Sequence, residues 1–175
     1  MQAAANAHIC GCFGDNMITH PFPPVFDADS EILILGSFPS VKSRENMFYY
    51  GHPQNRFWRV IAAVCGVSTP QSIEEKTALL LNNHIALWDV LASCEISGSA
   101  DSSIRHPVPN DLTHILSRCS IRRIYTNGRT SDRFYTRFSR MDTGRDAVCL
   151  PSTSPANAAW TLDRLIDAWR CITIS

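Results

Sequence analysis

Short apolar runs recur along the chain and predict strands. The run at residues 31–36 closes on a glycine and is typical of a strand buried on both faces of a parallel sheet. Similar runs occupy residues 85–90, 121–126 and 147–150. We therefore expect a parallel sheet of about four strands.

Segments with helical periodicity lie between these runs. From residue 55 to 66, apolar side chains recur at helical spacing. A second helix begins near residue 69, where Ser72, Glu74 and Glu75 supply the acceptors and the acidic charge that a first turn prefers. The alternation of strands and helices predicts an α/β fold with helices on both faces of the sheet, a three-layer αβα sandwich. Further helices are predicted at residues 110–119, 129–138 and 158–169.

The N-terminal part of the chain differs from the rest. Residues 1–19 show no sustained period and are expected to form a flexible extension. Three prolines between residues 21 and 24 exclude a helix and favour an extended segment along the edge of the domain. No repeat, linker or low-complexity tract follows, so residues 20–175 are predicted to form a single domain.

The composition fits a globular protein with a buried core. Of the 175 residues, 45% are hydrophobic and 18% are charged. No run of about 18 apolar residues is present to span a bilayer, and the first residues lack the pattern of a secretory signal, so a cytoplasmic location is expected. Lys plus Arg and Asp plus Glu each number 16. Nucleic acid would therefore have to bind to a local basic surface.

The seven cysteines are expected to be reduced and structural. Five of them stand singly, mostly inside apolar runs, where cysteine usually behaves as a small buried hydrophobe. Only Cys10 and Cys12 with His8 approach the clustering of a metal site. Their position in an Ala/Gly-rich leader favours a flexible tail over a metal site. We expect no metal and no cofactor.

Candidate chemistry is sought in the loops that follow the strands, because sites in open parallel sheets form at the carboxyl ends of the strands. The first such loop carries GSFPS at residues 36–40 and FYYGHPQNRFW at residues 48–58. Ordinary connections have about 4–6 residues, so this long stretch of Gly, Pro, aromatic and amide residues predicts a packed functional loop. The loop after the fourth strand carries LPSTSPAN at residues 150–157.

Both loops resemble the active-site motifs of the uracil-DNA glycosylase superfamily. Residues 36–58 are similar, without a gap, to the first motif region of mismatch-specific uracil-DNA glycosylases. Residues 150–157 are similar to the second motif, a Pro-Ser-rich turn before the last helix. The same strings resemble the hypoxanthine (deoxyinosine) DNA glycosylase branch most closely, and LWDVL at residues 87–91 looks like the base-reading strand of that branch.

The resemblance implies a uracil-DNA glycosylase-like fold and a monofunctional DNA glycosylase of base-excision repair. Such an enzyme flips a deaminated base, here expected to be hypoxanthine, out of the DNA and directs water to C1′. Two alternatives stay open: a uracil-DNA glycosylase that acts on G:U mismatches, and a catalytically inactive DNA-binding relative. The expected partner is DNA with a damaged or deaminated base, and we expect a monomer.

The resemblance also assigns roles in a base pocket. Tyr50 takes the position of the aromatic residue that stacks on the flipped base, with a core tyrosine as the alternative. Phe38 stands where relatives carry Asp or Asn, and a phenyl ring cannot hold the attacking water. Asn55 is the expected water holder, or else it caps the helix that follows, with Ser37 and Asp89 as the next candidates.

Three further polar residues belong to the expected pocket. Asp89 is expected to read the base edge by accepting from an N–H of hypoxanthine, with a purely structural acid as the alternative. Asp101 is a further candidate acid or base. Ser152 stands where relatives often carry His or Asn to stabilise the leaving base or contact its edge.

The last loop supplies candidate contacts to DNA. Ser154 would hold a phosphate, and Pro155 with Ala156 would fill the space left by the flipped nucleotide. Asn157 would contact DNA or cap the final helix, and the cap is the preferred interpretation.

The first loop and several basic residues are the other candidates for backbone contacts. Pro39, Ser40 and Ser43 would face phosphates, or else be ordinary turn residues. Arg129 follows the third strand and is well placed to contact DNA. Arg122 and Arg123 precede that strand and are expected at the opposite end of the sheet. The remaining candidates are Arg56, Arg105 and His106.

Overall fold

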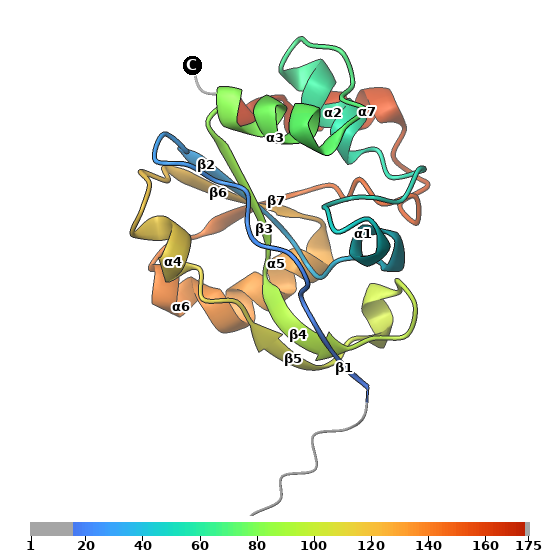
Figure 1. Ribbon diagram of the computed structural model, residues 1–175, viewed down its shortest axis with the longest axis vertical. Helices are drawn as coiled ribbons and strands as arrows, with labels where there is room; N and C mark the ends of the chain where they lie inside the picture. Colours follow the sequence, from blue (N-terminus) through green and yellow to red (C-terminus); the bar gives the residue numbers. More distant parts are fainter. Residues whose placement is uncertain (1–15, 174–175) are drawn as a thin grey trace, which may run out of the picture.

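The computed structural model describes residues 16–173, and a four-stranded parallel sheet forms its centre (Figure 1). All neighbouring strands pair in parallel, in the order β3-β2-β6-β7. The predicted parallel sheet is therefore confirmed. Its strands are β2 (Ile32–Gly36), β3 (Ile85–Asp89), β6 (Arg123–Asn127) and β7 (Ala147–Leu150).

Helices cover both faces of this sheet. The face at the top of Figure 1 carries α2 (Phe57–Val64), α3 (Ile73–Asn82) and α7 (Leu162–Trp169). The opposite face carries α4 (Thr113–Leu116), α5 (Arg129–Phe134), a π-helical turn (Tyr135–Ser139) and α6 (Arg140–Thr143). The predicted three-layer αβα sandwich is confirmed.

Alternate side chains of β2 divide the core into two parts. Ile32 and Ile34 belong to the cluster that contains residues of α2, α3 and α7, whereas Leu33 and Leu35 belong to the cluster under α4 and α5. All four side chains are at most 3% exposed, as expected for a strand covered on both faces. This packed centre fixes where the loops after the strands begin.

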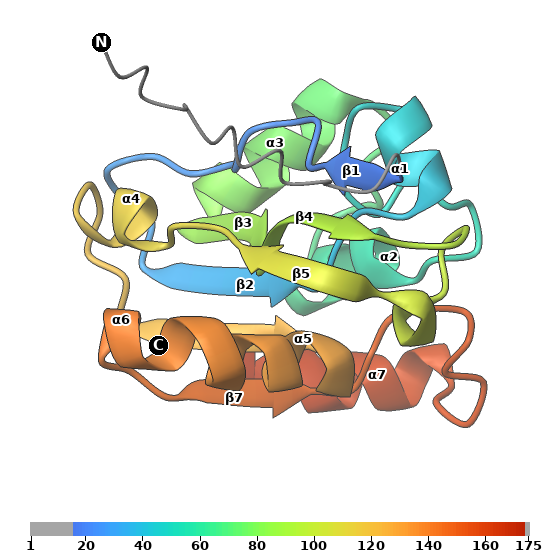
Figure 2. The same ribbon diagram turned by 90° about the horizontal axis from the view of Figure 1, so that it is seen from below.

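A second sheet, which no pattern in the sequence predicts, lies on the α5 side of the first (Figure 2). It is antiparallel, in the order β1-β4-β5. Only Val90 separates β3 from β4, so one extended segment passes from one sheet into the other. The strands are β1 (Met17–Thr19), β4 (Leu91–Glu95) and β5 (Arg105–Pro109).

The second sheet changes two expectations. Residues 17–19 pair with β4, so the folded chain begins before the predicted boundary at residue 20. The polar loop predicted after residue 97 contains a 3-10 turn, η1 (Asp101–Ser103), and then continues into β5. β5 contains Pro107 and Pro109, and it tolerates them because it is an edge strand.

Capping residues decide where two of the helices begin. The Ser72 hydroxyl accepts from the N–H of Glu75 and the Glu75 side chain accepts from the N–H of Ser72, which confirms the predicted first turn of α3. α7 begins later than predicted because the hydroxyl of Thr161 accepts from the N–H of Arg164. The preferred interpretation of Asn157 as the cap of this helix is therefore wrong.

Other segments depart from the prediction in length. The first loop contains a short helix, α1 (Val41–Glu45), and the helix predicted at residues 110–119 is reduced to α4. The proline-rich segment is extended as predicted, and Val25 forms a bridge with Leu87 at the edge of the parallel sheet. A final 3-10 turn, η3 (Arg170–Ile172), follows α7. Between residues 16 and 173, no helix has the length and apolar character needed to cross a membrane.

Candidate active site

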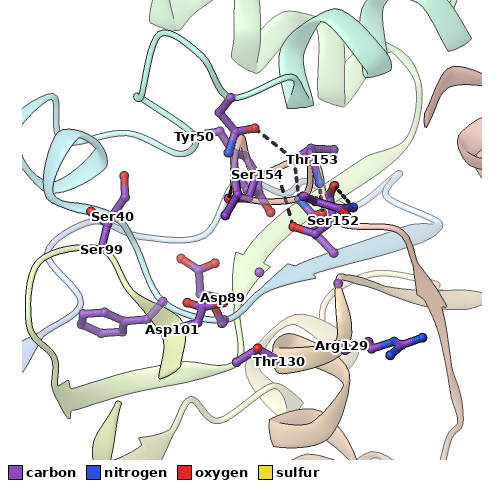
Figure 3. Close-up of a pocket in the computed structure, with 18 of the residues that line it drawn as sticks. Ser40, Tyr50, Asp89, Ser99, Asp101, Arg129, Thr130, Ser152, Thr153 and Ser154 are labelled. Carbon is purple, nitrogen blue, oxygen red and sulfur yellow. Dashed lines mark hydrogen bonds between the residues drawn. The ribbon is translucent and has the colours of Figure 1, made fainter. Parts of the chain in front are cut away.

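A cleft of about 1090 Å³ opens at the carboxyl ends of the parallel strands (Figure 3). The loops that follow β2, β6 and β7 line it, as predicted, and β3 contributes its last residue, Asp89. Its walls come from the first loop, from the segment around η1, from the start of α5 and from the last loop. This arrangement brings residues far apart in the sequence to one space large enough for a nucleobase.

Gly36 and Asp89 end two neighbouring strands and meet at the base of the cleft. They are partners in the register of β2 and β3. A Cβ atom on residue 36 would lie 2.1 Å from Oδ1 of Asp89, so glycine leaves the space that the carboxylate occupies. Asp89 is only 4% exposed, and its Oδ2 is 2.9 Å from Nε2 of His20. The buried acid is thus paired with a histidine, as a buried carboxylate requires a partner.

A second carboxylate, that of Asp101, is held against the first loop. The hydroxyl of Ser37 donates to its Oδ1 at 2.9 Å. Burial raises the pKa of Asp101 above its ordinary value, while the bond from Ser37 lowers it and the charge of Asp89 adds to the rise. A carboxyl group with a raised pKa in a cleft is suited to accept a proton.

Tyr50 lies in the cleft with an unusual backbone conformation. Its φ angle is 51°, in the left-handed region that bulky residues rarely adopt. One face of its ring stacks on Phe57 at a centroid distance of 4.0 Å. Its hydroxyl is buried without a hydrogen-bond partner among the described residues, and burial together with Asp89 raises its pKa. Phe57 therefore supports the tyrosine from behind, which leaves one ring face for a ligand.

Asn55 lies where it can both bond to the start of α2 and face the cleft. Its Oδ1 accepts from the N–H of Phe57 at 2.9 Å, a bond at the start of α2, and from the hydroxyl of Thr153 at 3.0 Å. Thr153 in turn exchanges two hydrogen bonds with the side chain of Asn127. Since the oxygen of Asn55 is occupied, its amide nitrogen is the atom that remains to act in the cleft, and it can only donate.

Arg56 stabilises the last loop through hydrogen bonds. The guanidinium donates to carbonyl oxygens of Thr153, Ser154, Asn157 and Trp160. Arg56, considered above as a phosphate ligand, is therefore committed to the protein itself. The side-chain amide of Asn157 donates to the carbonyl of Ser152 at 2.9 Å, so this residue also closes the loop instead of capping α7.

The remaining side chains of the last loop lie near its surface. Pro155 and Ala156 are exposed, and Ser152 and Ser154 are partly exposed. The two hydroxyls accept from backbone N–H groups of Ser154 and Ala156. These residues line the cleft on the side of α7, except for Pro155.

Two of the candidate phosphate contacts in the first loop, Pro39 and Ser43, are buried. Ser43 is 2% exposed, accepts from the N–H of Gly51, and lies 3.0 Å from the hydroxyl of Ser40. Burial makes Ser43 a support of the loop rather than a phosphate contact. Ser40 caps α1 and borders the cleft together with the buried Pro39.

Phe38 faces both the core and the cleft. It is 7% exposed, packs in the cluster under α4 and α5, and lies edge-on to the ring of His20 at 6.1 Å. Its ring also borders the cleft. The phenylalanine thus forms part of the wall beside Asp89 and supplies no polar group to the reaction.

The basic residues divide between the two ends of the sheet. Arg129 is exposed at the first turn of α5 and lines the cleft. Arg122 pairs with Glu31 at the opposite end of the strands, as predicted for Arg122 and Arg123. Arg105 and His106 are exposed on β5, outside the residues that line the cleft.

Two features of the site escape sequence reasoning. His20 stands in a segment that was interpreted only as extended chain, and its pairing with Asp89 spans 69 residues of sequence. Thr153 is completely buried and connects Asn55 to Asn127, although its place in a Ser/Thr-rich loop gave no sign of this.

Cysteine and metal chemistry have little support in the described part of the chain. Its five cysteines are free, and Cys94 is buried as expected, whereas Cys149 and Cys171 are exposed and correct that expectation. Cys149 lies on β7, an edge strand. No group of three His, Cys, Asp or Glu suited to a metal occurs between residues 16 and 173. The cluster of His8, Cys10 and Cys12 lies outside the described residues.

The chain is similar to known proteins over most of its length. The family model for the uracil DNA glycosylase superfamily matches residues 23–172. A protein of Methanosarcina acetivorans named hypoxanthine DNA glycosylase is 37% identical over 150 residues, which cover 85% of this chain and 94% of that protein. A protein of the same name from Methanosarcina barkeri is 35% identical over 139 residues, 78% of this chain and 86% of the relative.

A solved structure agrees with these matches. The solution NMR structure of a protein from Methanosarcina acetivorans, proposed to be a uracil DNA glycosylase, superposes with a TM-score of 0.74 at 33% identity. The match covers 89% of this chain and 98% of that one. The sequence match, the shared fold and the position of the cleft agree with one another: the chain belongs to the uracil DNA glycosylase superfamily.

Proposed function

We propose that the protein is a hypoxanthine DNA glycosylase, which hydrolyses the N-glycosidic bond of a deaminated base in DNA. The relatives that carry this name are 37% and 35% identical to the chain. The observation that carries the proposal for this chain is the meeting of Tyr50, Asn55, Asp89 and Asp101 in one cleft. Together they supply a stacking surface, a hydrogen-bond donor and two acceptors.

The base would enter the cleft by flipping out of the DNA. Its plane would lie on the free face of Tyr50, whose other face rests on Phe57. Stacking of a base on an aromatic side chain is worth about 1–3 kcal/mol, and it is available to any flipped base. Stacking therefore supports binding, and the choice of base must come from polar groups such as Asp89.

The hydrolysis needs a water molecule that is held and then deprotonated. The amide nitrogen of Asn55 would donate to the water oxygen, since its own oxygen is occupied by Phe57 and Thr153. An amide cannot take the proton at neutral pH. Asp101 would accept it as the water oxygen bonds to C1′ and the base departs with the electrons of the C1′–N bond.

Contacts with the DNA backbone would come from the rim of the cleft. Ser40, Arg129, Ser152 and Ser154 all border it. Pro155 and Ala156 are exposed and would fill the space left by the flipped nucleotide. Ser152 would then lie near the leaving base.

The test is base release from synthetic DNA. Oligonucleotides with a single deoxyinosine, deoxyuridine or deoxyxanthosine are incubated with the protein, and alkali-labile abasic sites are quantified. We expect cleavage at deoxyinosine, and Asn55→Ala should abolish it while the protein stays folded. Preferred cleavage at deoxyuridine would instead indicate a uracil-DNA glycosylase. Binding of all three without any cleavage would indicate a DNA-binding relative that has lost the reaction.

A further inference from the structure

We propose that His20 positions Asp89, and that the pair recognises a ring N–H group and thereby separates hypoxanthine from adenine and uracil from cytosine. The inference rests on the proposed function and assigns the specificity of the same cleft. It gives a role to a residue from the N-terminal segment, far in sequence from both active-site loops.

The Asp89 carboxylate has one occupied and one free oxygen. Its side chain is 5% exposed and borders the cleft (Figure 3). Oδ2 lies 2.9 Å from Nε2 of His20. Oδ1 lies over Gly36, has no hydrogen-bond partner between residues 16 and 173, and is not sealed from the cleft. One oxygen is therefore used for positioning, and the other is available to a base.

His20 is held in an aromatic cage. Its side chain is 4% exposed, and the rings of Phe22, Phe38 and Tyr49 lie 4.6, 6.1 and 6.0 Å from its own ring. The backbone N–H of His20 donates to the carbonyl of Ala92 at 2.7 Å, which fixes the segment beside β4. The imidazole therefore has little freedom to move away from Asp89.

The cage also selects the form of the imidazole. Nδ1 of His20 is buried and has no hydrogen-bond partner among the described residues. A proton on Nδ1 would be a buried donor without an acceptor, which is rare in proteins, whereas an unprotonated nitrogen is tolerated more easily. The favoured form therefore carries its proton on Nε2 and donates it to Asp89. Oδ2 of Asp89 then accepts this hydrogen bond, because a protonated Nε2 has no lone pair to offer.

An acceptor that is held in place can recognise the change that deamination makes to adenine and to cytosine. Deamination of adenine to hypoxanthine turns the N1 lone pair into an N1–H, and deamination of cytosine to uracil does the same at N3. Oδ1 of Asp89 can accept from either N–H. Against adenine or cytosine it would face a second lone pair, and neither group would be satisfied. The pair therefore separates hypoxanthine from adenine and uracil from cytosine by the ring N–H rather than by the size of the base.

The expected selectivity is large. A site built to form a hydrogen bond with a substrate group rejects an analogue that lacks this group by about 10⁴- to 10⁵-fold in favourable cases. Release of the carboxylate from His20 would shift Oδ1, and a misplacement of about 1 Å in an active site costs about 100-fold. Loss of His20 should thus reduce both the rate on deoxyinosine and the discrimination.

The experiment compares His20→Phe, His20→Gln and Asp89→Asn with the parent protein. Phenylalanine keeps a ring in the cage but has no donor, whereas glutamine carries an N–H at nearly the same reach. His114→Phe is the matched control, because this exposed histidine packs edge-on to Phe26 away from the cleft. Excision of deoxyinosine is measured together with inhibition by free hypoxanthine and by free adenine, and thermal unfolding shows that each variant is folded.

We expect the ratio of hypoxanthine to adenine inhibition to fall by about 10- to 100-fold in His20→Phe and at least as much in Asp89→Asn. His20→Gln should recover most of the loss, and His114→Phe should change nothing. Nitrogen NMR of the parent protein should place the His20 proton on Nε2. An unchanged ratio in His20→Phe, or a proton on Nδ1, would overturn the inference. If the parent protein releases no hypoxanthine at all, the proposed function fails instead.

Discussion

Gly36→Ala is the sharpest probe of the cleft, because the smallest possible side chain would meet its central carboxylate. The added Cβ would lie 2.1 Å from Oδ1 and 3.3 Å from Cγ of Asp89, and 3.0 Å from the hydroxyl of Tyr50. Carbon and oxygen atoms in proteins do not approach so closely, so the carboxylate must retreat by about 1 Å. The bond from His20, now 2.9 Å, would be stretched beyond hydrogen-bond length.

Two costs follow from this displacement. Insertion of a methyl group into a packed region costs about 1–3 kcal/mol, and the loss of a buried hydrogen-bond partner costs about 1–3 kcal/mol. Since the carboxylate can partly relax into the cleft, we expect the free energy of unfolding to fall by about 2–4 kcal/mol. Excision of deoxyinosine should fall by about 100-fold, because the reading oxygen moves by about 1 Å.

Urea unfolding and single-turnover excision measure the two effects on the same preparation. Gly144→Ala is the control: no atom lies within 4 Å of its added Cβ, and its φ of 62° makes alanine strained there, so stability should fall while excision is retained. Asp89→Ala removes the clashing atoms, and the double variant with Gly36→Ala should therefore be no less stable than Asp89→Ala alone. If Gly36→Ala unfolds and reacts like the parent protein, the placement of the carboxylate over residue 36 is refuted.

Three other predictions address the reaction and the DNA surface. Asn55→Asp keeps the side-chain oxygen that accepts from the N–H of Phe57 but loses the amide donor. The rate of excision should therefore fall by more than about 100-fold, with little change in the free energy of unfolding. Turnover at the parent rate would show that another group holds the water. The raised pKa of Asp101 means that the folded state favours the protonated carboxyl group, so the stability that this group contributes is lost as pH rises through that pKa. Asp101→Asn should therefore be more stable than the parent protein in urea unfolding at pH 7, and its pH–rate profile should lack the acidic limb. An unchanged profile would exclude Asp101 as the base. Arg129→Gln should weaken DNA binding and reduce the slope of log affinity against log salt concentration by about 1. Arg122→Gln, at the other end of the sheet, should leave both the affinity and the slope unchanged, and equal slopes for the two variants would show that Arg129 does not contact DNA.

The parallel sheet could be predicted from the sequence because its strands are buried on both faces and therefore appear as continuous apolar runs. β2 is the clearest case, with Ile32 to Leu35 all at most 3% exposed. The second sheet could not be predicted, since β1 has three residues and β5 contains prolines that usually argue against a strand. Local capping was predicted correctly at Ser72 but wrongly at Asn157, where Thr161 is the residue that meets the geometry.

The site was predictable only where its residues lie in continuous motifs. Tyr50 and Asn55 stand in the first loop and border the cleft as expected. His20 was missed because its partner is 69 residues away and no local pattern marks the pair. The commitment of Arg56 to carbonyl oxygens was missed for the same reason, since its acceptors lie about a hundred residues later in the chain.

The hydrogen bonds of Arg56 have a consequence for how the protein meets its substrate. By holding four carbonyl oxygens of the last loop beside the start of α2, this side chain joins into one unit the two loops that would face DNA in the proposed function. Such a unit would adapt little to an intact duplex, so most of the deformation would fall on the DNA. Mispaired or unpaired nucleotides leave the base stack at the lowest energetic cost, and the proposed enzyme would therefore engage them more readily than intact pairs.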